Sequence, residues 1–536
     1  MPLDEGVNVD LQFLIVEVKK QARASLSYID KPSPGKSRRI KEREDYVDNL
    51  KNTLENKSYY QIHRLEDDDR QMNYFKALIT IAANLERVSD FFENIADQMD
   101  YVADHEYFRE FNLKRYYREI DRALDMIYPA LTQHNLELAQ GLCDAEQTID
   151  DLYDESFLAV RQNLRGRRKV DDSLTLLFIV RYLERVGDTF LNIGEAILNI
   201  HLGEKMGIRQ FRNLRMALEG QGIDIRSNTV EFKSIMNTRS GSRVGKVVST
   251  GDDKEEQVLF YKEGVKDKID EEVAGLKRWS RVQSVKVPRV LFHDSRKKDA
   301  TLLLEYIEGN DLLEILINQR ARSGQALDLL ADSLIALWDE TMRTRSVKSN
   351  HISQLISRTD DIVSVHRQLF SLEENMAQML KDAKKLESDL KSPFSVLIHG
   401  DFNVDNIIYR PEADHVYFVD VHRSRSGDYV QDISVFLVSN FRIPIFSSDI
   451  RQRLNEANLK IYEVASTYAA THGDATFHAR LALGVFRSLV TSTRFLFDES
   501  FSKDMFMRGT GVLRDLLEHK DDLPSFTLSA DYFLYK

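Results

Sequence analysis

Cysteine, proline and tryptophan are all scarce in this chain, which has one cysteine, nine prolines and two tryptophans among 536 residues. With Cys143 as its single cysteine, the chain can form no internal disulfide and no C-x-x-C metal or redox motif. Cys143 lies in a helical pattern, which favours a buried small apolar residue over a nucleophile. These features predict a protein of the reducing cytoplasm.

Long hydrophobic runs and an excess of positive charge are also missing. The run from Leu174 to Val180 is far shorter than the roughly 18 residues that a membrane-spanning helix needs. The N-terminal residues Met-Pro-Leu-Asp-Glu-Gly have no basic region ahead of an apolar core, so no secretory signal is predicted. The net charge of −12 argues against general nucleic-acid binding, because a phosphate backbone attracts basic surfaces.

The length exceeds what one hydrophobic core usually organises, so two or three domains are expected. Residues 8 to 217 have apolar side chains at intervals of three and four, which predicts helices. The predicted helices cover residues 8–28, 38–61, 70–102, 109–136, 137–166 and 172–203. A further amphipathic stretch between 204 and 220 predicts a connecting helix.

An internal repeat relates the third and sixth predicted helices. The segment that begins Leu85-Glu-Arg-Val matches the segment that begins Leu183-Glu-Arg-Val, with eight identities in thirteen positions. The preceding helices also correspond in their acidic positions. Two three-helix units, duplicated within one chain, follow from this repeat.

The repeated Glu-x-x-x-Asp motif places two carboxylates one turn apart on a helix face: Glu86 with Asp90, and Glu184 with Asp188. Such a pair can chelate a cation, with acidic residues of the neighbouring helix completing an oxygen shell. The duplicated pattern resembles the phosphate-uptake regulator PhoU, a resemblance that implies Fe, Zn or Mn on these helices. The alternative is that the carboxylates pair with arginines on a solvated surface.

The stretch from residue 396 to 420 contains the strongest chemical signal. Short apolar runs of strand type flank a polar loop that contains Asp401 and Asn406, and Asp420 ends the next run. Phosphoryl transfer needs a carboxylate beside the attacking hydroxyl and oxygen ligands for magnesium. Asp401 is therefore the predicted catalytic residue, with Asn406 and Asp420 as predicted Mg²⁺ ligands at the interval of a kinase catalytic loop.

His399-Gly-Asp-Phe-Asn-Val-Asp-Asn-Ile, followed by Val419-Asp-Val, resembles the catalytic core of the aminoglycoside phosphotransferase and choline kinase family, which is related to protein kinases. The resemblance implies ATP as phosphoryl donor and a small-molecule hydroxyl as acceptor. Asp432 is interpreted as a structural residue that binds the backbone of this loop. The alternative is that Asp and Asn residues are frequent in this stretch because they favour turns.

Earlier residues fit the small lobe of such a fold. Lys262 lies on a predicted strand and Glu272 on the following helix, in the order that a kinase uses to hold nucleotide phosphates. Glu271 competes with Glu272, which is preferred because Val273, Leu276 and Trp279 then pack beside it. The adenine ring is expected to contact backbone from Glu305 to Ile307, an inference from the resemblance alone.

The glycines near residues 241 and 245 match neither a Walker loop nor G-x-G-x-x-G, but a hairpin there could still cover nucleotide phosphates. After the catalytic stretch, Arg423 and Arg425 are candidate substrate-binding residues, with Arg442 a further candidate, and they suit an anionic substrate. Pairing of these arginines with Asp428 or Asp432 is the alternative. Acidic residues between 456 and 499 could instead serve a cationic acceptor.

These observations predict a multidomain chain: an all-α PhoU-like bundle at 1–217, a linker at 218–230, and an α+β two-lobed kinase-like domain with lobes at 231–310 and 311–536. The predicted function is an ATP- and Mg²⁺-dependent phosphotransferase that acts on a small molecule and is regulated by the helical domain. The alternative is a non-catalytic, nucleotide-sensing regulator that contacts a transport or signalling protein. Protein phosphorylation and oligomerisation stay open.

Overall fold

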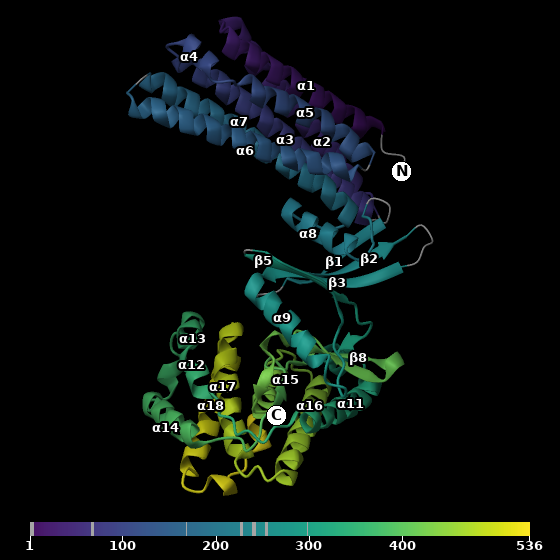
Figure 1. Cartoon of the computed structure of the whole chain (residues 1–536), viewed down its shortest axis with the longest axis vertical. Coiled ribbons are helices and arrows are strands. Elements are labelled where there is room, and N and C mark those ends of the chain that lie inside the picture. The colour runs from purple at the N-terminus through teal and green to yellow at the C-terminus, as the bar shows by residue number, and fades with distance from the viewer. Residues whose placement is uncertain are drawn as a thin grey trace. The chain divides into compact units, whose positions relative to one another are not determined.

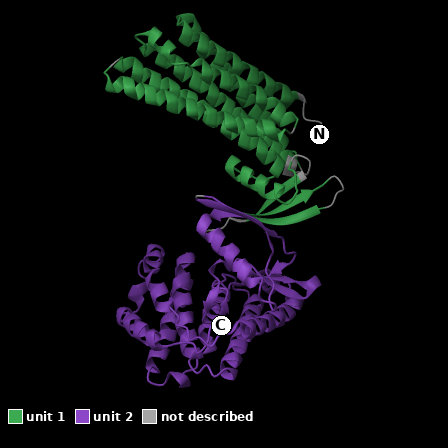
Figure 2. Ribbon diagram, in the orientation of Figure 1, with its two compact units in different colours: residues 1–261 green, residues 262–536 purple. Residues whose placement is uncertain are grey.

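A computed structural model describes residues 5–65, 69–133, 135–167, 169–225, 229–237, 243–251, 256–296 and 298–535. The chain divides into two compact units, residues 1–261 and 262–536 (Figure 2). The predicted fold class, a helical region followed by a domain of helices and sheet, is confirmed. Among the described residues, no helix is both long and apolar enough to cross a membrane.

The first unit consists mainly of six long helices, which are drawn in purple to blue in Figure 1. They are α1 (Glu5–Asp30), α2 (Pro34–Ile62), α3 (Asp69–Gln98), α5 (Lys114–Thr132), α6 (Leu136–Arg165) and α7 (Val170–Leu202), joined by the short α4 (His105–Glu110) and followed by α8 (Ile208–Glu219). Helices α1, α2 and α3 pack on one another, α5, α6 and α7 do the same, and α3 packs on α7. This arrangement fits the repeat of three helices that the sequence predicts.

Two helix boundaries differ from the prediction. Helix α2 begins at Pro34 rather than near residue 38, because proline is compatible with the first turn of a helix, where its missing N–H costs no hydrogen bond. The predicted helix 109–136 corresponds to α5, which begins only at Lys114. Residues 109 and 110 belong instead to α4, which starts where the side chain of Asp104 accepts a hydrogen bond from Glu106 and ends at the extended residue Phe111. Asn135 caps α6 in the same way.

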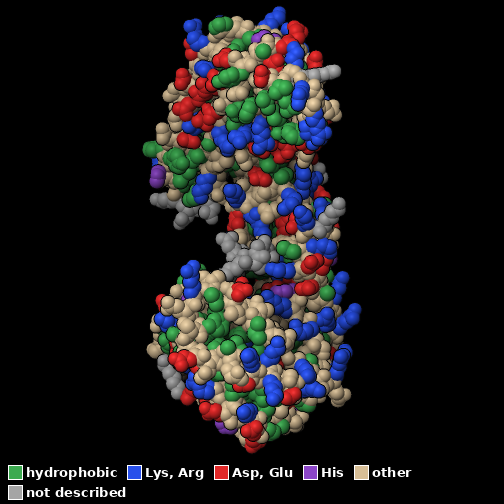
Figure 3. Space-filling model, turned by 90° about the vertical axis from the view of Figure 1, so that its left-hand side faces the viewer, with side chains coloured by type: hydrophobic (Ala, Val, Ile, Leu, Met, Phe, Trp, Pro, Cys, Tyr) green, Lys and Arg blue, Asp and Glu red, His purple; other side chains and the backbone are tan. Residues whose placement is uncertain are grey.

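The repeated helices α3 and α7 form the centre of the bundle. Each has fully buried apolar residues at intervals of three and four, among them Leu85, Val88 and Phe92 in α3 and their counterparts Leu183, Val186 and Phe190 in α7. Cys143 is buried, as predicted. On the face shown in Figure 3, charged side chains of both signs lie on the outside of the helices, with hydrophobic side chains exposed between them.

A five-stranded sheet follows the helices, in the order β1-β2-β3-β5-β4. Its strands are β1 (Thr229–Asn237), β2 (Arg243–Thr250), β3 (Glu256–Val265), β4 (Val290–Ser295) and β5 (Asp299–Glu305). β1 pairs antiparallel with β2, and Gly245 is required there because a Cβ would lie 2.2 Å from the ring of Phe232. The turn around Gly241, proposed to cover phosphates, lies outside the described residues.

The second unit begins within β3, at Lys262, and is mostly helical after the sheet. Its helices are α9 (Lys266–Trp279), α10 (Leu312–Asn318), α11 (Arg320–Thr341), α12 (His351–Ile356), α13 (Thr359–Val365), α14 (Met376–Asp389), α15 (Val430–Phe441), α16 (Ser448–Thr471), α17 (Phe477–Ser492) and α18 (Glu499–Glu518). Short strands lie between them: β6 (Asn310–Asp311), β7 (Val396–Ile398), β8 (Ile407–Arg410), β9 (His415–Phe418) and β10 (Arg425–Gly427). β7 pairs with β10, and β8 lies between β6 and β9, so the predicted catalytic loop is framed by two small sheets.

Candidate functional site

The polar loop between β7 and β8 is held against the segment that follows β9. Gly400 has a φ of +85°, and a Cβ at this position would lie 2.5 Å from the carbonyl oxygen of Arg423. Only glycine allows so close an approach. The buried His399 donates through Nε2 to the carbonyl oxygen of Val419 at 2.9 Å. The loop and the end of the β8–β9 hairpin therefore form one rigid element.

Asp432, near the start of α15, holds the same loop through hydrogen bonds to its backbone. Its two carboxylate oxygens accept hydrogen bonds from the backbone N–H groups of His399 at 2.6 Å and Gly400 at 2.8 Å. Burial raises the pKa of Asp432 to about 7, although the two backbone hydrogen bonds act in the opposite direction. The structural role that the sequence suggested for this residue is confirmed.

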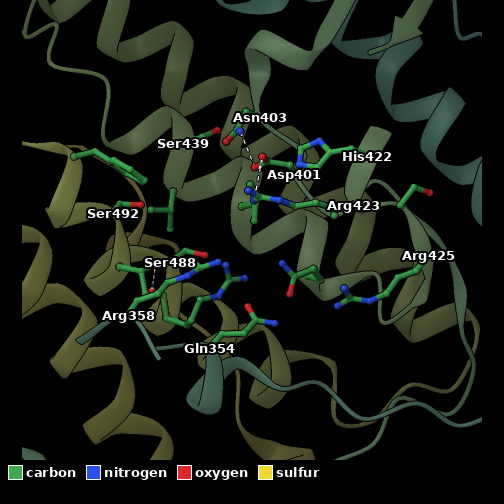
Figure 4. Close-up of a pocket in the computed structure, with 18 of the residues that line it drawn as sticks. Gln354, Arg358, Asp401, Asn403, His422, Arg423, Arg425, Ser439, Ser488 and Ser492 are labelled. Carbon is green, nitrogen blue, oxygen red and sulfur yellow. Dashed lines mark hydrogen bonds and ion pairs between the residues drawn. The ribbon is translucent and has the colours of Figure 1, made fainter. Parts of the chain in front are cut away.

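Asp401 is oriented by two neighbours (Figure 4). Asn403 Nδ2 donates to Oδ1 of Asp401 at 2.9 Å, and Arg423 Nη1 lies 3.1 Å from its Oδ2. Asn406, in the 3₁₀ turn Val404–Asn406, donates through Nδ2 to the backbone oxygen of Asp401 at 2.8 Å. The backbone oxygen of Asn406 in turn accepts from the N–H of Val419 at 3.0 Å. Hydrogen bonds thus link Asn406 to Asp401 and to Val419, the residue before Asp420.

Asp420 follows β9 in the left-handed backbone region, with a φ of 57°, which aspartate tolerates better than most residues. Burial by itself would raise the pKa of Asp420, but the hydrogen bond from His422 and the charge of Lys262 lower it below its ordinary value. The carboxylate is therefore ionised at neutral pH. His422 Nδ1 lies 3.1 Å from Asp420 Oδ1, a contact that the sequence analysis did not predict.

Lys262 of β3 reaches the same place. Its Nζ lies 2.6 Å from Glu272 Oε2 and 2.8 Å from Asp420 Oδ1. Of the two candidate glutamates on α9, Glu272 is the one that meets the lysine, while Glu271 lines a neighbouring pocket. Burial disfavours the ammonium, but the two carboxylates raise the pKa of Lys262 above its ordinary value. The structure therefore joins the small-lobe residues to the catalytic stretch.

The predicted hinge residues follow β5. Glu305 Oε2 pairs with Nε of Arg289 at 2.9 Å, and the N–H of Glu305 donates to the carbonyl oxygen of Arg289 at 3.0 Å. Because the N–H of Glu305 already donates this hydrogen bond, it is not the group that would donate to the adenine ring. Ile307 is buried. Their contact with adenine stays a prediction.

Asp401 opens onto a pocket of about 620 Å³. Its walls come from α9, α12, α15 and α17, the catalytic loop and the 3₁₀ turn Thr493–Phe495. Arg423 and Arg425, the predicted substrate-binding residues, both line it, and so does Arg442. Asn406 and Asp420 are not among its lining residues, so they face another side of the loop.

Four arginines of this pocket were missed by sequence reasoning: Arg278, Arg358, Arg487 and Arg494. One signal was available. Arg487 interrupts an apolar helix, in Leu481-Ala-Leu-Gly-Val-Phe-Arg-Ser-Leu-Val, where a charged residue has no structural reason to be buried. The other three arginines lie on separate elements, and no sequence pattern indicates that these elements meet.

The repeated carboxylates of the first unit lie beside further carboxylates. Glu86 and Asp90 of α3 interact with Asp48 and Glu44 of α2, and burial together with Asp90 raises the pKa of Glu44 to about 7. In the second repeat, the pKa of Glu184 is raised by burial and by neighbouring carboxylates, among them Asp188.

Cations pair with part of each group. Lys51 Nζ lies 3.4 Å from Glu86 Oε1, and Arg181 Nη1 lies 2.6 Å from Glu184 Oε1. Oε2 of Glu184 is buried and has no hydrogen-bond partner among the described residues. Within the described part of the chain, no three His, Cys, Asp or Glu side chains are arranged closely enough to hold a metal ion. Metal binding by Glu86, Asp90, Glu184 and Asp188 therefore stays a prediction.

Comparison with known proteins gives two separate matches. The model of the phosphotransferase enzyme family (APH) matches residues 246–472, and the PhoU domain model matches residues 14–99 and 113–197. The phosphate-specific transport system accessory protein PhoU homolog 1 of Thermotoga maritima is 26% identical over 197 residues, covering 36% of this chain and 84% of the relative.

Two solved structures are also similar to parts of this chain. The phosphate transport system regulatory protein PhoU from Streptococcus pneumoniae is 15% identical, with a TM-score of 0.35, and covers 38% of this chain and 97% of its own. An aminoglycoside-3'-phosphotransferase of type VIII is 18% identical, with a TM-score of 0.36, and covers 52% of this chain and 98% of its own. The two family matches do not overlap along the sequence.

Proposed function

Since this chain joins a PhoU domain to a domain of the aminoglycoside phosphotransferase and choline kinase type, we propose that it transfers a phosphoryl group from ATP to a hydroxyl of a small molecule, under the control of the helical domain. One observation carries the proposal. Asp401 lines a pocket of about 620 Å³, and its backbone oxygen accepts a hydrogen bond from Asn406 of the same loop. His399 of this loop is hydrogen-bonded to Val419, the neighbour of Asp420, and Asp420 pairs with Lys262, which also pairs with Glu272.

In this proposal, Asp401 orients the acceptor and receives its proton. The hydroxyl oxygen of the acceptor bonds to the terminal phosphorus of ATP, the bond from that phosphorus to the bridging oxygen breaks, and the electron pair leaves with ADP. Asn403 and Arg423 hold the two carboxylate oxygens of Asp401 in a fixed direction. Such positioning supplies a large part of the rate enhancement in phosphoryl transfer.

Asn406 and Asp420 would hold magnesium, and their chemistry fits this ion. Asn406 uses its Nδ2 to bind backbone, which leaves its oxygen as the ligand atom, and Asp420 is ionised. Bound magnesium neutralises the charge of the phosphate oxygens. Lys262, positioned by Glu272, would hold the phosphates of the nucleotide, with the adenine ring at the backbone of Glu305 to Ile307.

The catalytic assignment is tested by Asp401→Asn. We expect this variant to bind nucleotide normally and to lose turnover by about a hundred- to ten-thousandfold, the usual loss when a positioned base is removed. Turnover is measured as ADP release across pools of hydroxylated metabolites. The matched control is Asp405→Asn, the same change at an exposed aspartate of the same loop, which should keep the wild-type rate.

Equal rates in wild type and Asp401→Asn would contradict the assignment. If wild type binds nucleotide and releases no ADP with any pool, the second candidate applies, and the domain is a nucleotide sensor that regulates phosphate transport or signalling.

A further inference from the structure

The pocket in front of Asp401 is strongly basic, although the chain as a whole is acidic. Seven arginines and two carboxylates, Glu271 and Asp401, line it. Arg423 is paired with Asp401, and Arg278 binds the backbone oxygen of Ser424. These partners compensate only part of the positive charge.

Buried hydrogen-bond donors at the pocket lack partners. Arg487 is 5% exposed and Ser488 is 4% exposed, both on α17, and Nε of Arg487 and Oγ of Ser488 have no hydrogen-bond partner among the residues that the structure describes. Nη1 of Arg494, in the 3₁₀ turn Thr493–Phe495 that follows α17, is also buried without a partner among the described residues. A buried donor without an acceptor is costly, which is why such groups are few in native proteins. Their gathering at one wall of a cavity indicates a ligand with several acceptor atoms.

The guanidinium groups also repel one another. Burial and the nearby charge of Arg358 lower the pKa of Arg487 to about 9, even though Asp401 acts in the opposite direction. Burial, followed by the charge of Arg423, lowers the pKa of Arg358, and Arg494 is affected in the same way by burial and Arg358. An anion placed among these three arginines would relieve both the repulsion and the missing hydrogen bonds.

We propose that the acceptor of this phosphotransferase itself carries a phosphate group, which binds between Arg358, Arg487 and Arg494 while a hydroxyl of the same molecule meets Asp401. This inference rests on the proposed function and names its substrate class. The labelled side chains in Figure 4 enclose such a space, with Arg358 and Ser488 on one side and Asp401 with Arg423 on the other.

A phosphate ester suits these donors better than a carboxylate. A carboxylate has two oxygens and is satisfied by one bidentate arginine, whereas a dianionic phosphate offers three terminal oxygens to several donors. Arginine is also the residue whose forked donors match phosphate geometry best. A cationic acceptor, such as an aminoglycoside or choline, would be repelled by the same groups.

Binding is tested first, with the full chain, saturating ADP to fill the nucleotide site, and inorganic phosphate as the titrant in calorimetry at low salt. We expect phosphate to bind wild type, and to bind Arg487→Met and Arg358→Gln about 10- to 100-fold more weakly, because each loses charged hydrogen bonds. Arg358 is half-buried, so its variant keeps the test valid if Arg487→Met fails to fold. Arg320→Gln, an exposed arginine paired with Asp449, is the matched control and should bind as wild type does.

A titration with malonate in place of phosphate compares the affinity of the site for a carboxylate with its affinity for phosphate. Tighter binding of malonate than of phosphate, absence of phosphate binding, or equal binding by all variants would each overturn the phosphate site.

Turnover is tested next with matched acceptor pairs: glycerol against glycerol phosphate, glucose against glucose phosphate, and inositol against inositol monophosphate, with choline as the cationic case. The proposal expects ADP release with a phosphorylated member of a pair and a lower rate in Arg358→Gln. Faster reaction of choline or of the neutral members would overturn the substrate class and leave phosphotransfer standing. Phosphate binding that depends on Arg487, without ADP release from any compound, would overturn phosphotransfer and leave only an anion site.

Discussion

Lys262 is the residue that connects the two lobes of the candidate site. Its ammonium lies within 3 Å of carboxylate oxygens from α9 and from the segment after β9. Both contacts are partly buried, where an ion pair is screened less than on the surface. Removing one partner of such a group leaves the others uncompensated.

We therefore expect Lys262→Met to weaken ATP binding at least tenfold, measured as the KM for ATP, and to lower the rate as well. Lys266→Met is the matched control, because Lys266 follows on the same chain segment and pairs with Asp270 away from Asp420. A wild-type KM for ATP in Lys262→Met would contradict the proposed phosphate contact.

His351 is an unusual residue of the second unit, because it is fully buried and neither ring nitrogen has a hydrogen-bond partner in the described part of the chain. Burial lowers its pKa well below 6.5, and the nearby Arg487, Arg480 and Arg425 lower it further. Glu387 lies close by but accepts hydrogen bonds from the backbone N–H of His351 rather than from the ring. The folded protein therefore holds this histidine in its neutral form.

A lowered pKa in the folded state means that only the unfolded chain gains a proton as the pH falls below about 6.5. Stability from this group is thus present above pH 6.5 and is lost on acidification, by up to about 2 kcal/mol between pH 7 and pH 5. We expect His351→Leu to flatten the decrease in melting temperature over this range. Other titrating groups, such as Asp432, are unchanged in the variant, so the difference between the two curves isolates His351. Identical curves would contradict this account.

At the scale of elements, α3 and α7 each place a Glu-x-x-x-Asp pair toward acidic residues of a partner helix, α2 or α6. Burial and neighbouring carboxylates raise the pKa values of Glu146 and Asp150 on α6, as they do for Glu184 on α7. Carboxylates that are both partly buried and close together are destabilising for the fold unless protons or cations neutralise them. Lys51 and Arg181 already pair with part of each group, and the described carboxylates do not form a ready metal site. The prediction that a metal ion is the further cation is tested by loading.

We expect wild-type protein loaded with Mn²⁺, Fe or Zn²⁺ to retain metal after desalting, measured by elemental analysis, and Glu86→Gln with Glu184→Gln to lose it. The matched control is Glu106→Gln with Glu155→Gln, two exposed glutamates outside the repeated pairs, one in each half of the bundle. Metal-free wild type after loading would end the proposal, and equal retention by both double variants would move the site elsewhere.

At the scale of the whole molecule, the predicted domain borders and the compact units describe different divisions. The predicted linker is 218–230, whereas the compact units meet between Tyr261 and Lys262, inside strand β3. A strand cannot be cut without losing the hydrogen bonds of its ladder. We therefore propose that the independent second domain begins at the predicted linker, residues 218–230, rather than at Lys262.

A fragment of residues 218–536 should unfold in one cooperative transition and retain phosphotransfer, because it contains all five strands of the sheet. A fragment of residues 262–536 should fail to fold, because it lacks β1, β2 and most of β3. Calorimetry and ADP release decide both points. A stable, active 262–536 fragment would show that the first two strands are dispensable.

The sequence by itself determined the features that are local in the chain. Hydrophobic periodicity specified the long helices, and the interval from Asp401 to Asn406, with Asp420 following, predicted a phosphotransfer loop, since both depend on residues within one or two turns or strands. The repeat related α3 to α7 because two segments of the sequence can be compared directly. The contact of Lys262 with Glu272 was predicted because a strand lysine followed by a helix glutamate resembles the order in a kinase small lobe.

Only the tertiary structure decided the character of the pocket. Arg358 and Arg487 are separated by more than a hundred residues, and they meet because α12 packs on α17 while α15 holds the catalytic loop beside them. Such a meeting depends on long-range packing, which leaves no periodic signal in the sequence. The net charge of the whole chain, −12, has the opposite sign to the charge of the pocket. The net charge sums all the side chains, whereas the charge of the pocket depends on the few side chains that packing brings together.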